Sequence, residues 1–142
     1  MILYLDTSSL VKLYVDEAHS DRVREWTAEA EVIATSRVAH PETLSALTRR
    51  HNSGDIAKPE YEKVVQAFTG EWGSYVALDF DEVEAGRLVR KYDLRGFDGV
   101  HLASAKLLAS ADADLHLVFS SFDERLNNAA RSEGFVVLAV AE

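Results

Sequence analysis

The stretch FDGVHLASAKLLASA, residues 97–111, decides the fold of this chain. Its residues are almost all apolar or small, and the chief exceptions are Asp98, His101 and Lys106. A helix that is apolar on most of its faces is normally buried. We therefore predict a helix here that packs centrally in the protein and begins close to an acidic residue.

Short apolar runs alternate with longer amphipathic runs on both sides of this helix, which is typical of βαβ units around a parallel sheet. The predicted strands cover residues 2–5, 32–35, 75–78, 117–119 and 135–138. The predicted helices cover residues 9–15, 20–29, 38–53, 59–72, 81–92, 97–111 and 123–132, and Ser20 is the expected N-cap of the second. The fold class is thus α/β, with a central, mostly parallel sheet of about five short strands flanked by about seven helices.

The composition is that of a globular protein. The 142 residues fit one domain, 1–142, with 47% hydrophobic and 27% charged residues and no cysteine. No secretory signal peptide and no run of about 20 apolar residues is visible, so we expect a cytoplasmic protein without a membrane segment. The net charge of −9 argues against a protein that simply coats nucleic acid, but not against an enzyme that cuts it.

Two acidic residues directly follow predicted strands. Asp6 ends the first strand, and Asp123 follows the fourth after a short link. Ligands bind beyond the carboxyl ends of the strands in open α/β sheets, which favours a functional site. The alternative is that each aspartate caps the next helix. Asp6 is the less cap-like of the two, because Thr7, Ser8 and Ser9 could also serve as caps.

Two further acids stand on predicted helices. Glu42 has Val38, Ala39 and Ala46 on its own helix face, so it lies on an apolar face rather than a charged one. Asp98 stands at the start of the central apolar helix, just after a glycine. An exposed surface acid is the alternative interpretation for Glu42. For Asp98 the alternative is a helix cap or a partner of the helix dipole.

Four acids that converge on one edge of a sheet are harder to explain as caps. Clustered carboxylates raise one another's pKa values, so a cation must neutralise them. Hard divalent ions with oxygen ligands, Mg²⁺ or Mn²⁺, fit this requirement. Such an ion can hold a phosphate oxygen and activate a water.

Four motifs together resemble the PIN-domain ribonucleases, and among them the VapC-type toxins of toxin–antitoxin pairs. The motifs are Leu3–Ser8, Pro41–Glu42 with the following Leu44–Leu47, Leu94–Ala105, and Phe119–Leu126. The resemblance covers nearly the whole chain and implies a PIN-like three-layer sandwich. Two departures are visible: Ser121 stands where threonine is commoner, and Gly99 where alanine is commoner.

The resemblance implies a function and a set of site residues. Asp6, Asp98 and Asp123 would hold Mg²⁺ or Mn²⁺, and Glu42 would complete the catalytic set. The reaction would be hydrolysis of an RNA phosphodiester bond by the toxin of a type II toxin–antitoxin pair. A cognate antitoxin and a homodimer are the implied protein partners. Transfer, ribosomal and messenger RNA are all open as substrates.

Several other residues are weaker candidates. Thr7, Arg95 and Ser121 are expected near the substrate, Arg95 because it precedes Asp98 by three residues. His101 is expected to be a packed or hydrogen-bonded core residue rather than a ligand. Six further basic residues are candidates for phosphate contacts, although an ordinary solvated surface position is the favoured interpretation of each: Arg49, Arg50, Arg87, Arg90, Lys91 and Arg125. Val64, Val65 and Phe68 give weak support for a homodimer through amphipathic helices.

Other classes of protein also combine a small α/β fold with an acidic magnesium pocket. A receiver domain needs adjacent acids after strand one and a late lysine, but Thr7 follows Asp6 and no lysine lies beyond Lys106. A haloacid-dehalogenase-like phosphatase needs Asp-x-Asp, and here the sequence is Asp6-Thr7-Ser8. A degenerate PIN domain that only binds partners is the third alternative, and the intact set of four acids speaks against it.

Overall fold

A five-stranded parallel sheet forms the centre of the molecule in the computed structural model, which describes residues 1–140. The strand order is β3-β2-β1-β4-β5, and each of the four neighbouring pairs is parallel. The strands are β1 (Ile2–Leu5), β2 (Val32–Ser36), β3 (Val76–Leu78), β4 (Leu117–Ser120) and β5 (Val136–Leu138). Because all strands run in one direction, their carboxyl ends meet at one edge of the sheet.

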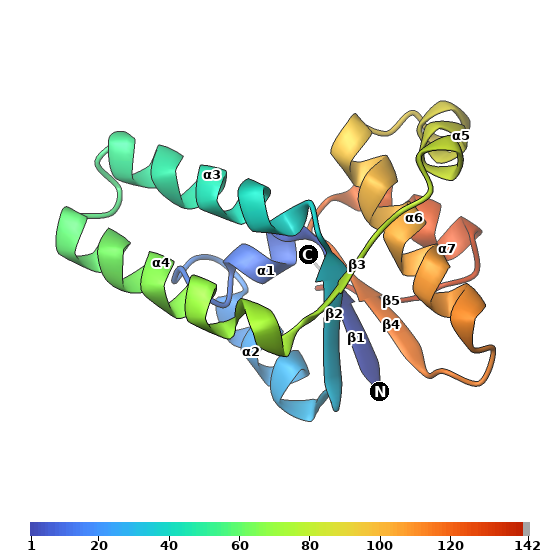
Figure 1. Cartoon of the computed structure of the whole chain (residues 1–142), viewed down its shortest axis with the longest axis horizontal. Coiled ribbons are helices and arrows are strands. Elements are labelled where there is room, and N and C mark those ends of the chain that lie inside the picture. The colour runs from blue at the N-terminus through green and yellow to red at the C-terminus, as the bar shows by residue number, and fades with distance from the viewer. Residues whose placement is uncertain (141–142) are drawn as a thin grey trace.

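Seven α-helices cover the two faces of the sheet within residues 1–140. They are α1 (Thr7–Val11), α2 (Ser20–Glu29), α3 (Ala39–Asn52), α4 (Lys58–Glu71), α5 (Glu82–Tyr92), α6 (Gly96–Ala111) and α7 (Glu124–Ser132), with a 3₁₀ turn, η1, at Trp72–Ser74. Helices α1 to α4 lie on one side of the sheet and α5 to α7 on the other (Figure 1). This arrangement confirms the predicted three-layer α/β fold. The predicted domain, 1–142, includes residues 141 and 142, which lie outside the described residues.

Side chains from β1 alternate between two hydrophobic cores. Leu3 and Leu5 pack with Leu10, Val23 and Phe68 between the sheet and the first helical layer. Tyr4 points the other way into the core under α5, α6 and α7. All three β1 side chains are fully buried, as expected for a central parallel strand with a helical layer on each face.

Helix α6 has the central place that its sequence predicts. Gly99 and residues 101–105 are buried, and α5 packs closely along it. The contact depends on Gly99, because a Cβ at this position would overlap the Cγ2 methyl of Val89 and lie 3.0 Å from the carbonyl oxygen of Ala85. The departure from alanine at this position therefore permits the close approach of α5.

Three local predictions are wrong. Helix α1 ends at Val11 rather than at residue 15, because the chain then folds back into turns toward α2. Ser20 is not the N-cap of α2, which is His19 with φ 70°. The Ser20 hydroxyl instead donates to the Val15 carbonyl at 2.9 Å and accepts from the Glu17 N–H at 3.0 Å. Phe68 is fully buried in the core, so it cannot contribute to a dimer surface.

None of the helices within residues 1–140 is both long and apolar enough to cross a bilayer.

Candidate active site

Asp6 is a buried carboxylate at the carboxyl edge of the sheet. The register pairs Leu5 with Ser120, so the residues that follow β1 and β4 lie side by side. The Ser121 hydroxyl donates to Asp6 Oδ2 at 2.6 Å, while the Ser8 hydroxyl and the Ser9 N–H donate to Oδ1 at 2.7 and 3.0 Å. Asp6 is thus the N-cap of α1, contrary to our ranking of it as less cap-like.

Asp123 is a helix cap and also faces the other acids. Its Oδ1 accepts the Leu126 N–H at 2.9 Å, which makes it the N-cap of α7. Its Oδ2 points the other way and accepts from Arg95 Nη2 at 3.4 Å. One carboxylate can therefore serve both roles, because capping uses only one of its oxygens.

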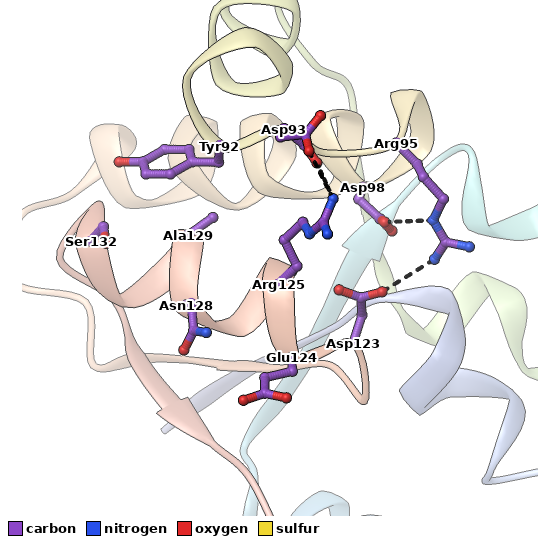
Figure 2. Close-up of a pocket in the computed structure, with 10 residues that line it drawn as sticks. All are labelled: Tyr92, Asp93, Arg95, Asp98, Asp123, Glu124, Arg125, Asn128, Ala129 and Ser132. Carbon is purple, nitrogen blue, oxygen red and sulfur yellow. Dashed lines mark hydrogen bonds and ion pairs between the residues drawn. The ribbon is translucent and has the colours of Figure 1, made fainter.

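Asp98 lies in the first turn of α6 and is not its cap. The helix begins at Gly96, and its N-cap residue Arg95 makes no side-chain cap bond. Arg95 Nε donates to Asp98 Oδ2 at 3.0 Å, so one guanidinium joins Asp98 to Asp123 (Figure 2). Burial raises the pKa of the Asp98 carboxyl above its usual value, although the bond from Arg95 opposes that rise. The charges of Asp123 and Asp6 add to the increase.

Glu42 lies in the first turn of α3 and is held by two donors to one oxygen. The Thr7 hydroxyl donates to Glu42 Oε1 at 2.6 Å, and His101 Nε2 lies 2.9 Å from the same atom. Burial raises the pKa of the Glu42 carboxyl, but these two bonds outweigh it and hold the pKa below its usual value. With 23% of its side chain exposed, Glu42 is not an ordinary surface acid.

The contact from His101 to Glu42 was not predicted. The expectation of a hydrogen-bonded core histidine is confirmed, since His101 is only 2% exposed. The sequence carried one signal: Asp98 and His101 are three residues apart and share a face of α6. Which residue of another helix meets that face depends on tertiary packing.

Two hollows flank Asp98 and Arg95, and both residues line each of them. One, of about 750 Å³, runs along α7 past Asp123, and Arg125 is held there by Asp93 (Figure 2). The other, of about 830 Å³, lies between α3 and the start of α6 and is lined by Thr7, Glu42 and Arg49. Asp98 thus stands where the two hollows meet, with Asp123 in the first and Glu42 in the second.

The remaining basic candidates lie elsewhere. Arg50 pairs with Glu17, and both Arg87 and Lys91 pair with Glu133 on the surface formed by α5 and α7. Arg49 and Arg125, two of the candidates for phosphate contacts, line the hollows beside the acids.

The acids provide the oxygen ligands that Mg²⁺ or Mn²⁺ prefers. They come from the ends of β1 and β4 and from the first turns of α3 and α6. In residues 1–140, no three acidic or histidine side chains are grouped closely enough to ligate one ion. The cation that Asp98 and Asp123 share is the Arg95 guanidinium, whose side chain is 79% exposed. The oxygen donors are of the kind that a divalent ion binds, but the acids would have to draw together, and Arg95 move away, to surround one.

The comparisons with known proteins agree with this fold. A family model described as "PIN domain" matches residues 3–132, and the chain belongs to the PIN-domain family. It is 31% identical over 136 residues to Ribonuclease VapC45 and to Ribonuclease VapC49, both of Mycobacterium tuberculosis. Each alignment covers 94% of this chain and 92% of the relative.

A solved structure has the same fold. FitAcB from Neisseria gonorrhoeae superposes with a TM-score of 0.64 at 18% identity, over 98% of this chain and 97% of that one.

Proposed function

We propose that this protein is an Mg²⁺- or Mn²⁺-dependent endoribonuclease that hydrolyses RNA phosphodiester bonds. The observation that carries the proposal is the arrangement of Asp6, Asp98 and Asp123, which reach one edge of the sheet from three elements far apart in the sequence. The ribonuclease names of the relatives support RNA as the substrate.

Asp6, Asp98 and Asp123 would hold the ion. When bound, the ion would polarise the phosphate and lower the pKa of a water. Glu42 would orient the attacking water and accept its proton. Both donors to Glu42 use Oε1, and within residues 1–140 no hydrogen bond reaches Oε2, which leaves that oxygen for the water. Arg95, released from the carboxylates, would contact the phosphate.

The same acidic edge supports a role as the toxin of a type II toxin–antitoxin pair. A cognate antitoxin would inhibit it by placing a basic side chain against Asp98 and Asp123, where Arg95 now lies. The net charge of −9 favours a partner with a basic contact segment. A homodimer remains a prediction, which light scattering of the isolated protein tests; a monomer would contradict it.

RNA cleavage by the pure protein tests the enzyme proposal. Wild type should cut RNA with Mg²⁺ or Mn²⁺, lose activity with EDTA and regain it when the metal is restored. Asp98→Asn should reduce the rate by roughly 100-fold or more, because it removes one charge from the metal site. Asp93→Asn is the matched control: this acid lines the same hollow, is 94% exposed and pairs with Arg125.

Two outcomes would contradict the proposal. Equal cleavage by Asp98→Asn and wild type would mean that the acids are not the site. No cleavage of any RNA, with partner binding intact, would favour the alternative of a PIN domain that only binds partners.

A further inference from the structure

His101 is a polar residue in the interior of the protein, and both of its ring nitrogens have partners. The side chain is 2% exposed and comes from the buried face of α6. Its Nδ1 lies 2.9 Å from the hydroxyl of Tyr4, which is itself fully buried on β1. Its Nε2 lies 2.9 Å from Glu42 Oε1 and 3.0 Å from Thr7 Oγ1.

The partners assign the tautomer. An ionised carboxylate only accepts hydrogen bonds, so His101 Nε2 must carry the hydrogen that it shares with Glu42. In the neutral ring, Nδ1 is then an acceptor, and the Tyr4 hydroxyl donates to it. The Thr7 hydroxyl donates its hydrogen to Glu42 Oε1. The hydrogen bonds thus run in one direction, from Tyr4 to His101 and from both His101 and Thr7 to Glu42.

We propose that His101 is a positioning residue that, oriented by Tyr4, holds the Glu42 carboxylate by Oε1 and so leaves Oε2 for the attacking water. The proposal rests on the proposed function, in which Glu42 orients and deprotonates water. Glu42 sits on α3, while the other acids come from the sheet edge and from α6. The bond from His101 ties the glutamate to the same helix that carries Asp98.

The surroundings explain why a histidine suits this position. Tyr4 stacks on Phe119 with ring centroids 5.4 Å apart and meets the His101 ring edge-on at 6.0 Å. These contacts fix the plane of the imidazole and hence the direction of its N–H. A flexible donor would lose more rotamer freedom when it holds Glu42 in one geometry.

The first test compares three variants for kcat and KM on one RNA substrate. His101→Met keeps the volume but removes the donor, and should lower kcat by roughly 10- to 100-fold with KM within about 2-fold. His101→Gln retains an N–H donor and should recover part of that loss. Leu102→Met is the matched control and should leave kcat unchanged, because Leu102 is fully buried on the same helix and has no polar side-chain atom. Urea denaturation confirms that each variant is folded.

A double-mutant cycle separates positioning from a structural effect. If His101 acts through Glu42, adding His101→Met to Glu42→Gln should change kcat by less than about 2-fold. Tyr4→Phe should cause a smaller loss in the wild-type background and none beside Glu42→Gln. Losses that simply multiply in the double mutants would overturn the proposal.

A crystal structure provides a readout that needs no activity. In the wild type, Glu42 should have one side-chain conformation with Oε1 bound to His101. In His101→Met it should rotate or split between conformations, and an unchanged Glu42 would overturn the proposal. If the wild type cuts no RNA, the proposed function fails while this comparison still decides the role of His101.

Discussion

Arg95 bridges to Asp98 with a 3.0 Å bond from its Nε to Oδ2, and its exposed guanidinium also reaches Asp123. The arginine therefore stands between two of the carboxylates that we propose as ligands of the metal ion. A resident cation must be displaced before a second cation can enter, so it opposes metal binding. The first prediction concerns this competition.

Arg95→Ala should bind Mn²⁺ about 2- to 5-fold more tightly than wild type in calorimetric titrations, the range expected for loss of an exposed ion pair. The same variant should cleave RNA more slowly at saturating metal if Arg95 contacts the phosphate. Arg90→Ala removes an equal charge from an exposed position of α5 and should leave Mn²⁺ affinity unchanged. Equal affinities in Arg95→Ala and wild type would show that the ion does not enter between Asp98 and Asp123.

Asp123→Asn should separate capping from charge. Asparagine caps helices about as well as aspartate, so the free energy of unfolding should change by less than about 0.5 kcal/mol. RNA cleavage should fall by roughly 100-fold, because a charge of the site is lost. Asp81→Asn makes the same change at the N-cap of α5 and should affect neither property. Full activity in Asp123→Asn would leave capping as the only role of Asp123.

Gly99→Ala should destabilise the protein by about 1–3 kcal/mol, although alanine is the better helix former. The added methyl would overlap Val89, and adding Val89→Ala should recover part of the loss. Gly86→Ala on α5 is the control: its Cβ would meet nothing within 4 Å, so it should be stabilising by about 1 kcal/mol. Chemical denaturation measures all four proteins. An unchanged midpoint for Gly99→Ala would mean that α5 shifts without cost.

Glu133 should make stability depend on acidic pH. Hydrogen bonds from Lys106, Tyr92 and Lys91 lower the pKa of this half-buried carboxyl from 4.5 to about 2. A pKa that is lower in the folded state means that the stabilisation is complete above about pH 4.5 and is lost as the pH falls toward 2.

Glu133→Gln should therefore reduce the free energy of unfolding by about 2 kcal/mol at pH 7. The difference from wild type should shrink between pH 4.5 and pH 2. Urea denaturation at several pH values provides the measurement, and Glu25→Gln, at a 61% exposed ion pair, should show little effect at any pH. A difference that stays constant with pH would contradict the assignment to the Glu133 charge.

Much of the fold follows from hydrophobic patterning alone. The apolar run at residues 2–5 and the buried helix at 97–111 are strong signals, because each must be covered by other elements. The end of α1 could not be predicted in this way, since residues 12–15 remain amphipathic after the helix stops. Beyond the helix, the Ser20 hydroxyl holds the turn that leads to α2 through its bonds with Val15 and Glu17.

The candidate site shows the same division. The position of Asp6 at the end of the first strand indicated a site residue. Its neighbours Thr7, Ser8 and Ser9 were equally possible caps of the following helix. The choice among them depends on Ser121, which is 115 residues away in sequence and holds the second oxygen of Asp6. The bridge from Arg95 to Asp123 and the bond from His101 to Glu42 join separate elements in the same way. No local pattern encodes such contacts.

The pairing of β1 with β4 also has a consequence for biosynthesis. Asp6 leaves the ribosome 115 residues before Ser121. A nascent chain cannot assemble the acidic edge until β4 has emerged and docked beside β1. A nuclease built in this order remains inert toward the RNA of the ribosome that is making it until β4 has been made and has paired with β1.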